Sequence, residues 1–195
     1  MALTKTTVID VVDPWVAVPA ATLKTGAAES LSTSYSSMLY IEVCPVEDAV
    51  EQSGMDIIIE VSYADDNWTT FTTLKSSKAT SNADTLNGGE SAGDTAMDLT
   101  DSTGYDTKGQ LWLIYDGTIA NSEVVRTKSD NIHEITVCYN IKHDHADTTP
   151  THTGVDHWAI ELPLSAAQVR VLYNNTDANC DMAVTSRISK VTDLG

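Results

Sequence analysis

Short runs of β-branched and aromatic residues, separated by turn-forming residues, recur along most of this 195-residue chain. The clearest run covers residues 68–74, where Trp68, Thr70, Thr72 and Leu74 fall on one face of a period-two pattern and Phe71 on the other. Comparable runs cover residues 35–44 and 55–63, and residues 64–67 have the composition of a turn. We therefore expect an all-β fold that contains a hairpin in this region.

Strand-forming runs return near the C-terminal end, at residues 158–164, 169–173 and 180–190. Because an isolated pair of strands is not stable on its own, these runs are expected to complete a sheet begun by residues 30–75. Residues 75–90 are rich in Ser, Thr, Asn and Gly and indicate a linker or long surface loop.

The predicted fold is a β-sandwich, jelly-roll or immunoglobulin-like, formed by residues 31–86 plus 157–195. Residues 87–156 are predicted to form a small β-barrel module inserted into a loop of this sandwich. Two domains in series are the alternative arrangement.

Residues 1–30 form a separate segment, with strand propensity interrupted by Pro14 and Pro19. This pattern fits an N-terminal edge strand of the sandwich or an extended arm that lies on a neighbouring subunit. Pro14 and Trp15 are therefore candidate contacts with a partner.

The charge balance limits the possible partners. The chain has 11 Lys and Arg against 28 Asp and Glu, a formal net charge of −17. Since binding a nucleic-acid backbone needs clustered basic side chains, we expect no nucleic-acid partner. A strongly acidic surface keeps particles soluble and apart, although the composition would also fit a salty habitat.

No stretch approaches the roughly 18–20 apolar residues of a membrane helix, and the N-terminal residues do not resemble a signal peptide. We expect no membrane partner and synthesis in the cytoplasm. Cys44, Cys138 and Cys180 are far apart and are interpreted as small apolar residues.

Histidines concentrate near the end of the module, at His143, His145 and His152, among several Asp residues. Two His residues separated by one position on a strand point to the same side and are possible metal ligands. The spacing fixes no third ligand, so His143 and His145 are weak metal candidates, and a solvated loop is the preferred interpretation. No metal or other cofactor is predicted, and all three His residues are candidate partner contacts.

Known catalytic motifs, including the nucleophile elbow, the zinc-protease motif and the phosphate-binding loop, do not occur in the sequence, so we expect no enzyme. Four tryptophans could form a platform for sugar stacking: Trp15, Trp68, Trp112 and Trp158. A carbohydrate-binding adhesin module is therefore one alternative function.

Residues 94–155 contain a recurring arrangement of short strands and turns. Its parts are residues 98–105, Lys108-Gly109, the apolar run 111–115 ending in Asp116-Gly117, residues 121–126 and a final His-containing loop. This arrangement resembles a small β-barrel module of structural proteins of tailed bacteriophages. The family pattern has a Gly-rich last loop, whereas this chain has residues 144–154 there.

The resemblance implies a virion structural protein. The specific expectation is a capsid decoration, or cement, protein that binds the major capsid protein on the capsid exterior. Self-association, for example as a trimer, is also implied. A neck, tail or fibre component is the alternative within the same class.

Overall fold

A computed structural model describes residues 6–46, 54–64, 66–76, 83–100, 109–116, 121–131 and 134–193. Every helix or strand assigned within these ranges is a β-strand, and none of the described segments is a helix able to cross a membrane. The prediction of an all-β fold is confirmed. Parts of the phage-like pattern, at residues 101–108 and 117–120, lie outside the described residues.

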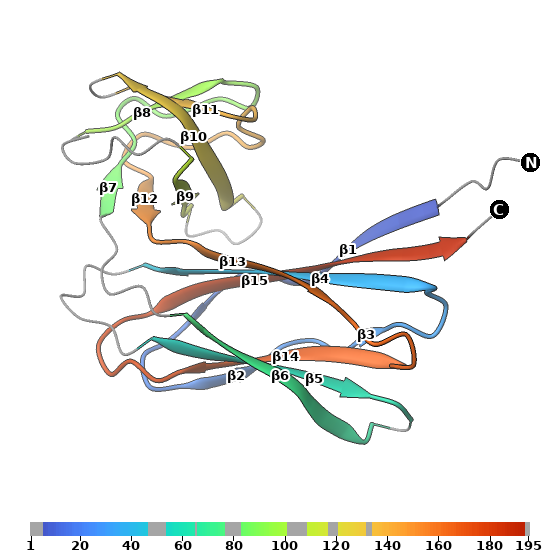
Figure 1. Ribbon diagram of the computed structural model, residues 1–195. Helices are drawn as coiled ribbons and strands as arrows, with labels where there is room; N and C mark the ends of the chain where they lie inside the picture. Colours follow the sequence, from blue (N-terminus) through green and yellow to red (C-terminus); the bar gives the residue numbers. More distant parts are fainter. Residues whose placement is uncertain are drawn as a thin grey trace, which may run out of the picture. The chain divides into compact units, whose positions relative to one another are not determined.

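The chain divides into two compact units (Figure 1). Unit 1 consists of two antiparallel sheets, ordered β1-β15-β4-β13 and β2-β14-β5-β6, with β3 paired to β14. Its strands are β1 (Thr6–Val18), β2 (Leu23–Thr25), β3 (Glu29–Ser30), β4 (Ser36–Pro45), β5 (Met55–Ser62), β6 (Trp68–Ser76), β13 (Asp156–Glu161), β14 (Gln168–Asn175) and β15 (Met182–Asp193).

The two sheets of unit 1 pack face to face as a β-sandwich, as predicted. The alternation in β4, β5 and β14 places every second side chain in the core, while the residues between them reach the surface. The core side chains of these three strands include Leu39, Ile41, Val43, Ile57, Ile59, Val61, Val169, Val171 and Tyr173. The expected hairpin is formed by β5 and β6, with a bulge between Ile59 and Glu60.

The N-terminal segment is part of the sandwich. β1 is an edge strand of the four-stranded sheet and pairs with β15, whereas β2 and β3 pair with β14 of the other sheet. The pairing of β1 with β15 shifts between Val11 and Asp13 and again between Asp13 and Val16. Each shift inserts one extra residue into β1, and such bulges redirect side chains.

The bulges turn the carboxyl group of Asp13 into the space between the two sheets. Its Oδ2 accepts hydrogen bonds from the Tyr173 hydroxyl at 3.0 Å and the Ser186 hydroxyl at 2.9 Å, and Oδ1 accepts one from the Ala27 amide at 2.9 Å. Asp13 therefore joins β1, β14, β15 and the chain that follows β2. A Cβ atom at Gly26 would lie 2.3 Å from Oδ2, so this approach requires glycine.

The Tyr173 hydroxyl donates its hydrogen bond to the Asp13 carboxylate. Burial, together with the neighbouring Asp13 carboxylate, raises the pKa of the Tyr173 hydroxyl well above its ordinary value of 10.0. The phenol is therefore protonated at neutral pH and acts as the hydrogen-bond donor to Asp13.

Unit 2 is a small barrel of short strands. They are β7 (Ala83–Thr85), β8 (Ala96–Asp98), β9 (Leu111–Ile114), β10 (Glu123–Asn131), β11 (Glu134–Val137) and β12 (Pro150–Thr153), in the order β7-β12-β9-β10-β11-β8. A bridge between Leu86 and Leu99 and backbone hydrogen bonds from Asn87 to Asp98 and from Thr100 to Thr85 connect the two ends of this sheet. The barrel-like module expected from the sequence is confirmed.

The interior of unit 2 is apolar and centres on fully buried Trp112. Its other members are Leu86, Met97, Leu99, Ile114, Val125, Ile135, Val137 and Ile141. These side chains come from β8, β9, β10, β11 and the segments that follow β7, β8 and β11, so the strands are held together by one shared core.

The Asp13 network generates a stability prediction for unit 1. Replacing Asp13 with Ala leaves the two buried hydroxyl groups of Tyr173 and Ser186 and the part-buried amide of Ala27 without their acceptor, so we expect a loss of about 3–5 kcal/mol in the free energy of unfolding. Tyr173→Phe removes a single donor and should cost about 1 kcal/mol. Urea unfolding followed by circular dichroism measures both, with Ser189→Ala on β15 as control. Equal losses for Asp13→Ala and Tyr173→Phe would contradict the central role of the carboxyl group.

Candidate functional site

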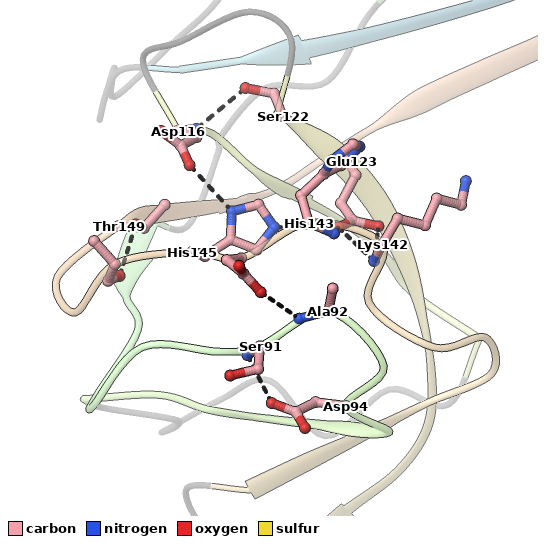
Figure 2. A network of polar contacts seen from close by, with 12 residues as sticks. Ser91, Ala92, Asp94, Asp116, Ser122, Glu123, Lys142, His143, His145 and Thr149 are labelled. Atoms are coloured by element: carbon pink, nitrogen blue, oxygen red, sulfur yellow. Dashed lines mark hydrogen bonds and ion pairs between the residues drawn. The ribbon is translucent and has the colours of Figure 1, made fainter.

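One histidine of the predicted cluster, His145, lies in a buried polar network of unit 2 (Figure 2). The imidazole of His145 is fully buried between two carboxylates: Nε2 lies 3.1 Å from Glu123 Oε1, and Nδ1 lies 3.4 Å from Asp116 Oδ2. Asp116 follows β9 and Glu123 begins β10, while His145 lies in the long loop between β11 and β12. The network therefore connects that loop to the two central strands of the barrel.

Besides its contact with His145, Glu123 binds the backbone of the same loop. Its carboxylate also accepts hydrogen bonds from the backbone amides of Lys142, at 2.9 Å and 3.1 Å, and of His143, at 3.0 Å. Burial by itself raises the pKa of Glu123, but the hydrogen bonds from His145, Lys142 and His143 outweigh it and lower the pKa below its usual value of 4.5.

The backbone holds His145 in place from the other side. His145 and Glu90 exchange two backbone hydrogen bonds, of 2.8 Å and 2.9 Å, and the amide of Ala92 donates to Asp144 at 2.8 Å. The loop that the sequence predicted to be solvated is therefore fixed at His145. The prediction failed there because the sequence does not show which carboxylates approach the imidazole from distant strands.

The two metal candidates do not share a site. His145 is buried with both ring nitrogens directed at carboxylates, while His143 is partly exposed and contributes its backbone amide to Glu123. Within the described ranges, no group of three or more His, Cys, Asp or Glu side chains has a geometry that could hold a metal ion.

The remaining candidate contacts differ in exposure. His152 is buried in β12 and meets Tyr115 edge to face, with ring centroids 6.3 Å apart. Trp15 is buried in the sandwich, whereas the neighbouring Pro14 is exposed. Of the five predicted partner contacts, only Pro14 and His143 present side-chain surface to solvent.

The four tryptophans do not form one platform. Trp15 and Trp112 are core residues of different units. Trp68, on β6, is half-buried beneath the guanidinium of Arg170, which lies 4.2 Å from the ring centroid and pairs with Glu60 at 2.7 Å. Trp158 is half-buried on β13, in the other sheet of the sandwich. The arrangement offers no stacked set of aromatic rings for a sugar.

An acidic groove of about 290 Å³ lies on unit 2, lined by Glu90, Asp94, Thr95, Ala96 and Asp98. Its carboxylates already bind local backbone: Glu90 accepts from the amide of Asp98, and Asp94 from that of Ser91, both at 2.7 Å. Burial, followed by the proximity of Asp98 and Asp94, raises the pKa of Glu90. The carboxylates of Glu90 and Asp94 therefore serve to hold the surrounding loops in place.

A different feature appears at one end of unit 1. Three large apolar side chains are exposed there: Tyr35 at 58%, Tyr63 at 51% and Leu164 at 74%. Backbone hydrogen bonds place their segments together, because Tyr35 donates to Val191, Leu162 to Ser37 and Ala167 to Ser62. We call Tyr35, Tyr63 and Leu164 the apolar end of unit 1. Sequence reasoning missed it, since each residue is isolated in the chain and only the strand pairing brings the three loops to one end.

No protein-family model and no curated protein matches this chain. Solved structures with weak similarity include that of Bacillus endospore appendages, described as disulfide-linked pili, at 9% identity and a TM-score of 0.35, covering 97% of this chain and 90% of that one. VP17, a capsid protein of bacteriophage P23-77, has 8% identity and a TM-score of 0.20, with 98% and 99% covered. The VP2 subviral particle of infectious bursal disease virus has 12% identity and a TM-score of 0.25, with 98% and 42% covered. At these TM-scores the similarities decide neither a family nor a function.

The His145 network predicts acid sensitivity in unit 2. Because the pKa of Glu123 is lowered by folding, its carboxylate stabilises the unit above the usual pKa of 4.5, and this stabilisation is lost as the pH falls through the lowered value. Glu123→Gln should therefore cost about 1–3 kcal/mol at pH 7, and the difference from the wild type should shrink on acidification. Hydrogen exchange of β9 and β10 peptides, followed by mass spectrometry, reports on this unit separately.

Glu161→Gln, at an exposed position of β13, is the matched control and should leave exchange in β9 and β10 unchanged. Unaltered protection in Glu123→Gln at pH 7 would show that the carboxylate does not hold the loop.

Proposed function

We propose that this chain is a structural protein of a tailed-phage virion that attaches to the outside of the capsid as a decoration protein. The observation that carries the proposal is the apolar end of unit 1, in a chain whose net charge is −17. The loops that carry these side chains lie at the same end of the sandwich, and exposed apolar surface favours association with another protein, whereas the acidic remainder keeps particles from sticking together.

The architecture supports an adhesive role. Unit 1 is a rigid sandwich whose core is continuous between two sheets, and its loops at the apolar end are tied to one another by backbone hydrogen bonds. A rigid, preorganised contact surface loses little conformational freedom on binding, which favours a stable complex. In this proposal the partner is the major capsid protein, and the chain performs no catalytic reaction.

The polar features of unit 2 fit the same proposal. The buried His145 and the acidic groove are both accounted for by contacts that fix loops, so they need no substrate or ion. The module would act as a second rigid part of the particle. Neck, tail or fibre attachment is the alternative position on the virion.

The first test is whether the chain is a virion component. Mass spectrometry of purified virions should detect it, and cryo-electron microscopy should show its density at icosahedral sites outside the capsid. Density in the neck or tail would move the proposal to that apparatus, and absence from the particle would overturn it.

The second test addresses the contact surface. The double substitution Tyr63→Ser and Leu164→Ser should reduce co-sedimentation with capsids that lack this protein by at least tenfold, because it removes two exposed apolar anchors. Leu23→Ser is the matched control, since Leu23 is also exposed but pairs with Asn174 toward the opposite end of the sandwich. Equal binding by both variants would exclude the apolar end as the attachment site.

A further inference from the structure

The two halves of β1 differ in how well their outer edge is protected against pairing with another strand. From Asp13 onward the strand carries two bulges and an exposed proline without an amide donor, which are the usual devices that prevent an edge strand from pairing further. From Thr7 to Val11 the pairing with β15 is regular, and no strand in the described part of the chain lies on the other side. This half exposes a row of backbone donors and acceptors without such protection.

The same half of β1 carries apolar side chains that are exposed to solvent. Ile9 is 69% exposed and Val11 is 59% exposed; they share the face that carries Ser189 and Arg187 of β15. Val8 is exposed on the opposite face. Edge strands that remain single usually carry outward charges, whereas this one presents β-branched residues on both faces.

Charge determines which partner fits. Two copies of a chain with a net charge of −17 repel each other, so a contact between copies requires a locally compensated site. Asp10 is the one charged residue from Thr6 to Val11, and its carboxylate pairs with Lys190 Nζ at 2.7 Å. Arg187, beside Val11, pairs with Glu42 at 3.0 Å. Among the described side chains, Asp10 therefore has a basic partner at this edge, and that partner, Lys190, also pairs with Glu29.

The sequence of this half is also self-complementary. In an antiparallel pair centred on Ile9, the Ile9 residues of two copies face each other, and Thr7 of one copy faces Val11 of the other. Every cross-strand pair on the outer face is then formed by β-branched side chains, which pack favourably across strands. Asp10 faces Val8, so no two carboxylates stand opposite each other.

We propose that β1 pairs with β1 of a second copy of this chain about a two-fold axis near Ile9. The pairing joins two four-stranded sheets into one sheet of eight strands. Because both copies use the same edge, no edge of this kind is left for a third copy, and the assembly ends at the dimer. It differs from the trimer suggested by the sequence resemblance. The pairing does not depend on the proposed attachment to a capsid, since the apolar end and the edge of β1 are separate sets of residues.

Sedimentation velocity of the full chain tests the pairing. The wild type should sediment as a dimer at tens of micromolar, and Ile9→Lys should be monomeric at the same concentration, because it places like charges opposite each other across the axis. Phe71→Lys is the matched control: Phe71 is an exposed apolar residue on another edge strand, β6, and its substitution should leave the dimer intact. Circular dichroism confirms that both variants fold.

Crosslinking gives an independent readout. In a Cys138→Ser background, which removes the exposed native thiol, Ile9→Cys should form a covalent dimer under mild oxidation and Phe71→Cys should not. A wild-type chain that remains monomeric, a trimer, or dissociation by Phe71→Lys and not by Ile9→Lys would each overturn the proposal. None of these results bears on whether the monomer binds a capsid.

Discussion

The buried carboxyl group of Asp13 is the contact on which unit 1 depends. It accepts hydrogen bonds from residues of both sheets and from the chain after β2, and it is available for this purpose only because two bulges rotate β1. Without it, the Tyr173 and Ser186 hydroxyls would be buried without this acceptor, and the part-buried Ala27 amide would lose its partner. One acidic residue thus fixes the edge strand, the spacing of the two sheets and the position of Gly26.

This arrangement divides β1 into two segments with different surroundings. The second half of β1 is bent, fastened to the interior and closed to further pairing. The first half is held from one side by β15, and no other strand of the described ranges pairs with its outer edge. The bulges therefore separate a segment that stabilises the fold from the segment that we propose pairs with a second copy.

The sequence predicted the strands of the sandwich well where β-branched and aromatic residues form a continuous run, as in β5 and β6, because such a run depends only on local order. It predicted the barrel-like module from a pattern of strands and turns. It did not predict the surroundings of His145, since Asp116 and Glu123 reach the imidazole through the pairing of β9 and β10. Nor did it show that Trp15 and His152 are buried, because an edge strand or a loop assigned from propensity carries no information on what covers it.

The connection between the units has a consequence for the folding of the chain. Ser76, at the end of β6, and Asp156, at the start of β13, are joined by a 2.7 Å hydrogen bond, although about 80 residues separate them. Closing so long a loop costs conformational entropy that grows with the logarithm of its length. Within unit 2, Ala83 pairs with His152, so the barrel brings its own two ends together. If unit 2 folds first, the pairing of Ala83 with His152 brings Ser76 and Asp156 within a few residues of each other along the chain. The remaining entropy cost of joining β6 to β13 is then small.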